Sequence, residues 1–457
     1  MITELIDTHC HLEMDAFDDD REKVIEHAED THIKYMINAG SDRDGNIKGL
    51  ELSGKYPNVF SAAGIHPHNA GTLDAQLYNE LQEWIKNPKV VAVGEIGLDY
   101  HYLHSPKGAQ IEAFRKQIAL AREADLPIIV HSREAKNDTI RILREEATDV
   151  AGVLHCFSGD LEMAKDVMGL GFYISIAGPV TFKNAKELRE IAAFVPDDFL
   201  LIETDAPYLA PVPMRGKRNE PSFLKYTAEV IAAIRGISAS DLSRITTLNA
   251  MRLFRIGKIH EHGEIVYRIR DSLYLNITNK CTNKCGFCVK SRTSYVKGHN
   301  LRLEKEPSAL QIIKAIKDPK AYKEIVFCGI GEPLLRLDVV KKVSKWVKEN
   351  GGKVRINTNG QGNLIHGKNI LPELLGIVDS ISVSLDAEDA KKYEKTCKPS
   401  IKGAYSGVIS FLKEAVKVIP EVKATVVNVP GINIEKCRKI AEEIGVELRV
   451  REFDMVG

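Results

Sequence analysis

The chain has 457 residues, a length that predicts two or three domains, each large enough for its own core. Lysine plus arginine and aspartate plus glutamate number 63 each, so no net charge draws the protein to nucleic acid or a membrane. No apolar run approaches the ~18 residues of a membrane span, and no signal peptide is expected. Eight cysteines, three of them clustered, favour a cytoplasmic protein with reduced thiols and metal chemistry over a disulfide framework.

Residues 1–256 alternate short β-rich segments with amphipathic helices. Strands are expected at Leu5–Thr8, Tyr35–Asn38, Val59–Gly64, Val90–Glu95, Ile128–His131, Gly152–His155, Tyr173–Ile176 and Leu200–Glu203. Eight strand–helix units in ~250 residues predict an α/β fold, a (β/α)8 TIM barrel. In that fold the chemistry lies at the carboxyl ends of the strands.

Side chains of the metal-binding type stand at those strand ends. They are His9, His11, Glu95, His131, His155 and Asp205. The spacing of His9 and His11 along an extended strand directs both imidazoles into the barrel mouth and Cys10 to the other side. Six such ligands exceed the need of one zinc ion, which predicts a two-metal site with Glu95 as the best candidate bridge. Two divalent ions (zinc, magnesium, manganese or similar) would lower the pKa of a shared water, and Asp205 is a candidate both for ligation and for accepting its proton.

Three further features of the barrel are candidates for substrate contact. His66 follows a strand, and we expect it either to contact a phosphate or protonate a leaving group, or simply to cap a helix. Arg133 lies two residues past a predicted ligand. Arg215, Lys217 and Arg218 form a short basic loop that either grips a phosphodiester or is a solvated surface loop. Phosphate contacts without a groove-reading helix imply weak sequence preference, which suits a nuclease that acts on ends.

Six short motifs resemble a known family in their type and order. They are His9–His11, Gly64–Pro67, Gly94–Tyr100, His131–Arg133, His155–Gly159 and Glu203–Pro207. Together they resemble the TatD-type metal-dependent deoxyribonucleases, within the amidohydrolase-like barrels, over residues 1–256. The resemblance implies that the six strand-end residues hold metal and that the substrate is DNA, single-stranded or at its ends, cleaved by a 3′–5′ exonuclease. An amide, ester or aminoacyl bond is the alternative, because such a water attacks carbonyls equally well.

After residue 256 the character of the sequence changes. Residues 257–270 are expected to form a linker and an opening strand, and Glu264–Arg270 with Leu273–Ile277 predicts a hairpin. Strands and helices then alternate again over residues 271–457. About six strands in ~185 residues predict a second domain that is an incomplete parallel barrel, a partial (β/α)6.

Cys281, Cys285 and Cys288 directly follow this hairpin, spaced C-x3-C-x2-C. Three thiolates in one loop suit a [4Fe–4S] cluster, and because such a cluster takes four ligands one iron stays open for another molecule. A structural zinc site would close with a fourth ligand at regular spacing, whereas the next cysteine, Cys328, is forty residues away. The two cysteines beyond it are far apart in sequence, so we expect no auxiliary cluster.

Residues 265–457 resemble the radical S-adenosylmethionine enzymes. The motif Gly329–Pro333 differs at one residue from the commoner Gly-Gly-Glu-Pro, having Ile-Gly before the glutamate. The resemblance implies that the three cysteines hold the cluster, that S-adenosylmethionine binds the open iron, and that a donor such as flavodoxin drives its reductive cleavage to a 5′-deoxyadenosyl radical. The expected cofactor contacts are Phe287, Gly329, Gly331, Glu332, Asn357, Asn359, Ser384 and Asp386. The substrate is not indicated, and an iron- or redox-sensing module that regulates the hydrolase is the alternative.

Overall fold

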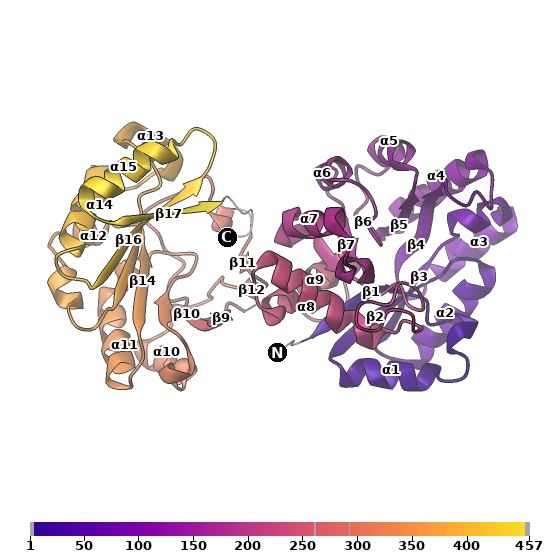
Figure 1. Cartoon of the computed structure of the whole chain (residues 1–457), viewed down its shortest axis with the longest axis horizontal. Helices are drawn as coiled ribbons and strands as arrows, with labels where there is room; N and C mark the ends of the chain where they lie inside the picture. The colour runs from indigo at the N-terminus through magenta and orange to yellow at the C-terminus, as the bar shows by residue number, and fades with distance from the viewer. Residues whose placement is uncertain (1–3, 260–261, 292, 453–457) are drawn as a thin grey trace. The chain divides into compact units, whose positions relative to one another are not determined.

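The structure, a computed structural model, describes residues 4–259, 262–291 and 293–452 (Figure 1). The chain divides into two compact units, Met1–Ile259 and His260–Gly457. All eight cysteines are free of disulfide bonds. Within the described residues, no helix combines the length and the apolar character needed to cross a bilayer.

The first unit is built on eight parallel strands that pair in chain order. They are β1 (Leu5–Cys10), β2 (Ile33–Ala39), β3 (Val59–Ala63), β4 (Val90–Asp99), β5 (Ile128–Arg133), β6 (Gly152–Leu154), β7 (Tyr173–Ile176) and β8 (Leu200–Ile202). A parallel bridge between Cys10 and Ala206 brings the segment after β8 back to β1. The predicted eight-stranded barrel is therefore confirmed.

Helices follow the strands and surround the barrel (Figure 1). They are α1 (Arg21–Asp30), α2 (Arg43–Lys55), α3 (Ala75–Trp84), α4 (Lys107–Glu123), α5 (Lys136–Glu146), α6 (Leu161–Gly169), α7 (Lys186–Phe194), α8 (Leu224–Arg235) and α9 (Ala239–Phe254). Side-chain caps mark where several begin: Asp42, Asp74 and Asp160 each accept an N–H of the first turn, and Ser238 and Asp241 form a capping box.

The alternation of side chains along the strands sets what faces the barrel interior. Ile129 and Leu201 pack in one buried cluster with Phe254 of α9. Because successive side chains of a strand alternate between faces, the residues two positions further along, His131 and Glu203, point to the same interior side. The amino-terminal part of the interior is thus apolar, and its carboxyl-terminal part carries the polar residues.

The second unit is built on a seven-stranded sheet in the order β17-β16-β15-β14-β13-β10-β9. Its strands are β9 (Val266–Ile269), β10 (Ser272–Leu275), β13 (Ile325–Phe327), β14 (Val354–Thr358), β15 (Ser380–Ser384), β16 (Glu421–Asn428) and β17 (Glu447–Glu452). β9 pairs antiparallel with β10, which confirms the predicted hairpin, and the other neighbours pair in parallel. The six parallel strands match the predicted partial barrel.

Six helices accompany this sheet in the described residues: α10 (Ala309–Ile316), α11 (Leu337–Glu349), α12 (Gly362–His366), α13 (Ala390–Cys397), α14 (Ala404–Ala415) and α15 (Ile434–Ile444). Alternate strand residues such as Ile356 and Ile381 pack against helix residues such as Val343 and Phe411 in one core. A two-stranded hairpin of β11 (Tyr295–Val296) and β12 (His299–Asn300), which the sequence did not predict, follows the cysteine loop.

Candidate metal centre and cysteine loop

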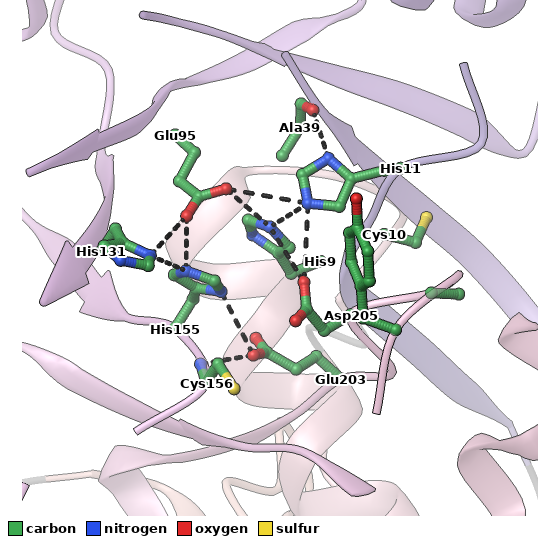
Figure 2. A network of polar contacts seen from close by, with 12 residues as sticks. His9, Cys10, His11, Ala39, Glu95, His131, His155, Cys156, Glu203 and Asp205 are labelled. Carbon is green, nitrogen blue, oxygen red and sulfur yellow. Dashed lines mark hydrogen bonds and ion pairs between the residues drawn. The ribbon is translucent and has the colours of Figure 1, made fainter. Parts of the chain in front are cut away.

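The first unit brings its predicted metal-binding side chains together at the carboxyl end of the barrel, as Figure 2 shows. They come from β1, β4 and β5 and from the segments just after β1, β6 and β8: His9, Glu95, His131, His11, His155 and Asp205. Cys10 points the other way, as expected, and its Sγ lies 3.5 Å from the carbonyl oxygen of Ile37.

Glu95 lies at the middle of this group, and its two carboxylate oxygens face different partners. Oε1 is 2.8 Å from Nδ1 of His131 and 2.7 Å from Nε2 of His155. Oε2 is 3.3 Å from Nε2 of His9 and 3.7 Å from Nε2 of His11. One carboxylate therefore joins two sets of imidazoles, which is the geometry that a bridging ligand needs.

Asp205 completes the second set. Its Oδ1 lies 3.5 Å from Nε2 of His11 and 3.8 Å from Nε2 of His9. Burial raises the pKa of Asp205, but a hydrogen bond from His11 and the charge of His9 outweigh it and hold that pKa below its usual value. For Glu95, burial raises the pKa, but the charge of His155 and hydrogen bonds from His131 and His155 outweigh it and hold that pKa well below its usual value. Both carboxylates are thus ionised at neutral pH.

The donor set fits divalent metal ions. Ligand atoms of His9, His11 and Asp205 lie within 4.8 Å of one another, and so do those of His66, Glu95 and His131. Imidazole nitrogens and carboxylate oxygens are ligands of zinc, manganese and magnesium. His9 Nδ1 is buried without a hydrogen-bond partner in the described residues, and Nε2 of His9 lies only 3.2 Å from Nε2 of His11. A cation between these two rings would accept the lone pairs of both Nε2 atoms.

Carboxylates that the sequence analysis did not assign stand behind the ligand histidines. Each lies beside the ring nitrogen that faces away from the centre, and such partners fix the tautomer and orientation of a metal-binding imidazole. The pairs are Asp99 with His131 (3.0 Å), Glu203 with His155 (3.4 Å) and Glu13 with His11 (3.5 Å). Their sequence signal is proximity alone, since each lies two or four positions along the chain from a predicted ligand: Asp99 from Glu95, Glu203 from Asp205 and Glu13 from His11.

His66 caps a short helix, one of its two sequence interpretations, and its ring also faces the candidate centre, whereas its contact with a substrate stays a prediction. Its Nδ1 accepts a hydrogen bond from the N–H of His68 at the start of a short 3-10 helix, and its Nε2 lies 3.3 Å from Oε1 of Glu95. Burial lowers the pKa of His66 to about 4, against the opposing charge of Glu95. The ring is therefore neutral at pH 7, and because Nδ1 is an acceptor its single proton is on Nε2, directed at the centre.

The four basic side chains that the sequence predicts to contact substrate have different surroundings. The guanidinium of Arg133 lies 4.8 Å from the ring centroid of Tyr102, and that of Arg215 lies 4.4 Å from the ring of Phe182. Lys217 is exposed. Arg218 instead makes two 2.7 Å bonds to the carboxylate of Asp20, which occupy both of its terminal nitrogens. Phosphate binding by these four side chains stays a prediction.

The three clustered cysteines of the second unit lie in one loop after β10, and backbone bonds fix that loop. The N–H of Lys284 donates to the carbonyl of Cys397 (2.9 Å), and the N–H of Gly286 to that of Thr396 (3.1 Å). The N–H of Ser400 donates to the carbonyl of Thr282 (2.8 Å). The loop is therefore tied to the end of α13. Cys397, remote in sequence, is buried here, and its thiol's contact with that of Cys285, together with burial, raises the pKa of Cys397.

The glycine motif lies directly against the segment that leads into the cysteine loop. A Cβ at Gly329 would come within 2.3 Å of Oδ1 of Asn276, and one at Gly331 within 2.3 Å of the carbonyl oxygen of Thr278. Glycine is required at both positions for this close approach. The two glycines thus allow this motif to pack closely against the segment before the cysteines, in addition to the cofactor contact that the sequence predicts.

Glu332 lies in a pocket of hydrogen-bond donors beside the cysteine loop. Its Oε1 accepts from Thr358 Oγ1 (2.7 Å) and its Oε2 from the N–H of Asn359 (2.7 Å). Burial raises the pKa of Glu332 to about 7. The side-chain amide of Asn359 in turn donates a 2.7 Å hydrogen bond to Oγ1 of Thr282, inside the loop. Two predicted cofactor contacts, Glu332 and Asn359, therefore lie next to the cysteines.

The remaining predicted contacts are spread along the same edge of the sheet. Asn357 and Ser384 are part of β14 and β15, and Oδ1 of Asn357 accepts a 2.8 Å bond from Arg355. Asp386 is buried with φ of 53°, and burial raises its pKa to about 6. Phe287, inside the cysteine loop, packs partly buried against the core of the unit. Their contact with a cofactor stays a prediction.

Comparisons with known proteins assign the two units to two different families. Residues 6–255 match the TatD related DNase family, and residues 275–444 match the Radical SAM superfamily. The chain is 47% identical over 254 residues to the uncharacterized metal-dependent hydrolase YabD of Bacillus subtilis, covering 55% of this chain and 100% of that protein. It is 36% identical over 259 residues to the 3′-5′ ssDNA/RNA exonuclease TatD of Erwinia tasmaniensis, again 55% of this chain and 100% of the relative.

The crystal structure of the TatD homolog YJJV from Escherichia coli K12 matches the first unit with a TM-score of 0.53 at 30% identity. This match covers 56% of the chain and 100% of that structure. The barrel, its ligand-type side chains and its relatives thus agree on a metal-dependent hydrolase. The chain belongs to the TatD related DNase family and carries a radical S-adenosylmethionine domain in its second half.

Proposed function

We propose that the first unit is a two-metal phosphodiesterase that shortens single-stranded DNA from its 3′ end. Six residues near the carboxyl end of the barrel would hold the two ions: His9, His11, Glu95, His131, His155 and Asp205. The observation that supports this most is the carboxylate of Glu95, whose two oxygens face separate sets of imidazoles. The relative named as a 3′-5′ ssDNA/RNA exonuclease supports the choice of substrate.

The protein's own groups have distinct tasks in this reaction. Divalent ions at the centre lower the pKa of water and neutralise charge on the attacked phosphate. Asp205, held ionised by His11, accepts the proton of the attacking water. His66 is neutral and carries its proton on Nε2. It lies beside Oε1 of Glu95, whereas Asp205 lies beside His9 and His11 near Oε2, and it donates a hydrogen bond toward a phosphate oxygen or the leaving group.

The test of this proposal is cleavage of a 5′-labelled single-stranded oligonucleotide with magnesium, manganese or zinc. We expect a ladder of products that shorten from the 3′ end. Glu95→Gln removes the charge that pairs with several buried imidazoles and should reduce the rate roughly 10²-fold or more, because charge stabilisation by metal ions contributes several kcal/mol. If the oligonucleotide stays intact with all three metals while simple esters are hydrolysed, the barrel is a carbonyl hydrolase instead.

For the second unit we propose a radical enzyme with a [4Fe–4S] cluster on Cys281, Cys285 and Cys288. When bound, the cluster supplies one electron, received from a donor such as flavodoxin, that cleaves S-adenosylmethionine to methionine and a 5′-deoxyadenosyl radical. Glu332 and Asn359 lie beside the cysteine loop and offer hydrogen-bonding groups to the methionyl moiety.

This second proposal is tested by anaerobic reconstitution with iron and sulfide. We expect about four irons per chain, absorption near 400 nm, and 5′-deoxyadenosine after addition of dithionite and S-adenosylmethionine. A cluster that forms but yields no 5′-deoxyadenosine would assign the unit to iron or redox sensing. Repeating the assay with nucleotides, nucleic acid and cell extract would identify the substrate class.

A further inference from the structure

Exposed large apolar side chains of the first unit gather at two loops. Tyr102 and Leu103 follow β4, and Tyr208, Leu209 and Val212 follow β8. Within residues 4–259, the other exposed large apolar side chains belong to α6 and α7. The two tyrosines are about half exposed, at 51% and 52%. Apolar surface concentrated around a polar centre marks a binding site more often than chance exposure does.

These two loops flank the metal centre from opposite sides. In a closed barrel of eight strands in chain order, β4 and β8 are four strands apart in either direction. The Tyr208 ring lies edge-on to His11, with centroids 6.3 Å apart. The Tyr102 ring lies 5.6 Å from that of His68, whose Nε2 is 3.1 Å from Asp99, the partner of His131. Each tyrosine thus adjoins one side of the centre.

Contacts with neighbouring groups hold each tyrosine in place. The N–H of Tyr102 donates to Oδ1 of Asp99 (2.9 Å), and its ring stacks with that of His104 at 5.6 Å and 12°. The guanidinium of Arg133 lies over the same ring. The Tyr208 N–H donates to the carbonyl of Asp205 (2.8 Å), and its hydroxyl lies 3.4 Å from Sδ of Met14. Because contacts already restrict both rings, little side-chain entropy is lost when a flat ligand stacks on them.

We propose that Tyr102 and Tyr208 are stacking platforms for the unpaired bases on either side of the scissile phosphate. This inference rests on the proposed phosphodiesterase activity. A single strand laid across the barrel mouth would put its phosphate at the metal centre and one base toward each loop. Arg133, beside Tyr102, then places a positive charge next to the neighbouring phosphate. A duplex cannot bind in this way, because its bases are stacked on each other.

The charge balance favours such platforms. Acidic and basic residues number 63 each, so binding of a polyanion is not driven by net charge. Of the predicted basic contacts, Arg218 is already paired with Asp20. Stacking is tolerant of sequence because every base has a flat face. The expected enzyme therefore prefers single strands and has little sequence preference.

The test compares Tyr102→Ala and Tyr208→Ala with the wild type on a single-stranded oligonucleotide. Loss of one stacked base should raise KM roughly 5- to 150-fold with little change in kcat. An abasic oligonucleotide of the same length should be cleaved equally by all three proteins. Tyr208→Phe should retain the wild-type KM. Phe194→Ala, which removes an aromatic side chain of 41% exposure from α7, is the matched control and should change neither constant.

Binding of a fluorescent phosphorothioate oligonucleotide, followed by anisotropy, separates this inference from the proposed activity. If the wild type cleaves no DNA, the phosphodiesterase proposal fails, whereas weaker binding by the alanine variants still supports the platforms. If the alanine variants bind and cleave like the wild type, the platforms are excluded. If the substitutions instead dissociate an oligomer in sedimentation and leave binding intact, the two loops are an interface between copies of the chain, which also overturns the inference.

Discussion

The candidate metal centre of the first unit takes its side chains from five different strands or the segments just after them, whereas the three thiols of the second unit come from residues 281–288 of one loop. The first arrangement exists only when the barrel is closed, because β1 and β8 meet through the bridge of Cys10 and Ala206. The second depends on a local backbone path that a few hydrogen bonds fix. One centre is thus a property of the whole fold and the other of a short segment.

The two units also treat a buried glutamate in opposite ways. At Glu95 the charges of surrounding histidines outweigh burial and hold the pKa well below its usual value. At Glu332 burial dominates over the hydrogen bonds from neutral groups such as Thr358 and the N–H of Asn359, and the pKa rises to about 7. Neutral donors therefore compensate a buried carboxylate less than imidazoles do. Glu95 is therefore fully ionised at neutral pH, whereas Glu332 is only partly ionised.

The largest expected effect tests the independence of the two sites. Cys285→Ala should abolish the absorption near 400 nm completely and leave oligonucleotide cleavage at the wild-type rate. Cys397→Ala is the matched control, because Cys397 contacts Cys285 from outside the loop and should leave the cluster intact. Loss of the cluster in Cys397→Ala would reveal a fourth thiolate ligand, and loss of cleavage in Cys285→Ala would show that the sites are coupled.

The next effect concerns the buried Glu332. Its folded-state pKa of about 7 lies above the ordinary 4.5, so between these values the folded protein holds a proton that the unfolded chain releases. The contribution of Glu332 to the stability of the second unit should therefore be largest below pH 4.5, fall by roughly 3 kcal/mol as the pH rises to about 7, and level off above it.

The measurement is urea unfolding at several pH values, followed by Trp346 fluorescence in a cluster-free Trp84→Phe protein. Trp346 lies in α11 and packs on the core of the second unit, which makes it a local reporter. Glu332→Gln should flatten the pH dependence. A slope that persists in Glu332→Gln would assign it to another group.

The smallest effect tests the carboxylates behind the ligand histidines. Asp99→Asn weakens the 3.0 Å bond that orients His131 and should reduce metal affinity roughly 10- to 100-fold, measured by competition with a chelator. Glu134→Gln disrupts a similar pair, with His101 at 2.7 Å, outside the centre and should leave metal affinity unchanged. Equal affinities in both variants would show that the strand ends alone position His131.

Much of the first site could be predicted because its residues follow strands that the sequence marks clearly. His131 and His155 each end an apolar segment, and the positions of all eight strands were found. Asp99 could not be assigned, because its role depends on the register between β4 and β5, which places Gly97 opposite His131. Register is set by tertiary contacts that a single strand does not encode.

Long-range pairing explains the other omissions. The basic loop gave no sign that Arg218 would bind Asp20, which lies 198 positions away. The sequence predicts no auxiliary cluster because Cys397 and Cys437 lie far apart, but it does not reveal that α13 brings Cys397 to the cysteine loop. The hairpin of β11 and β12 has only two residues in each strand, too few for a periodic pattern. In each case the deciding interaction joins segments whose proximity only the folded chain creates.

The bonds between the cysteine loop and the end of α13 have a consequence for repair. Lys284, Gly286 and Ser400 use their N–H groups to hold this loop through protein contacts alone. These bonds use none of the three thiols, whereas in small metal domains the metal–ligand bonds themselves supply the folding energy. Destruction of a cluster by oxygen should therefore leave the attachment of the loop to α13 in place, so that a new cluster can form without refolding of the domain.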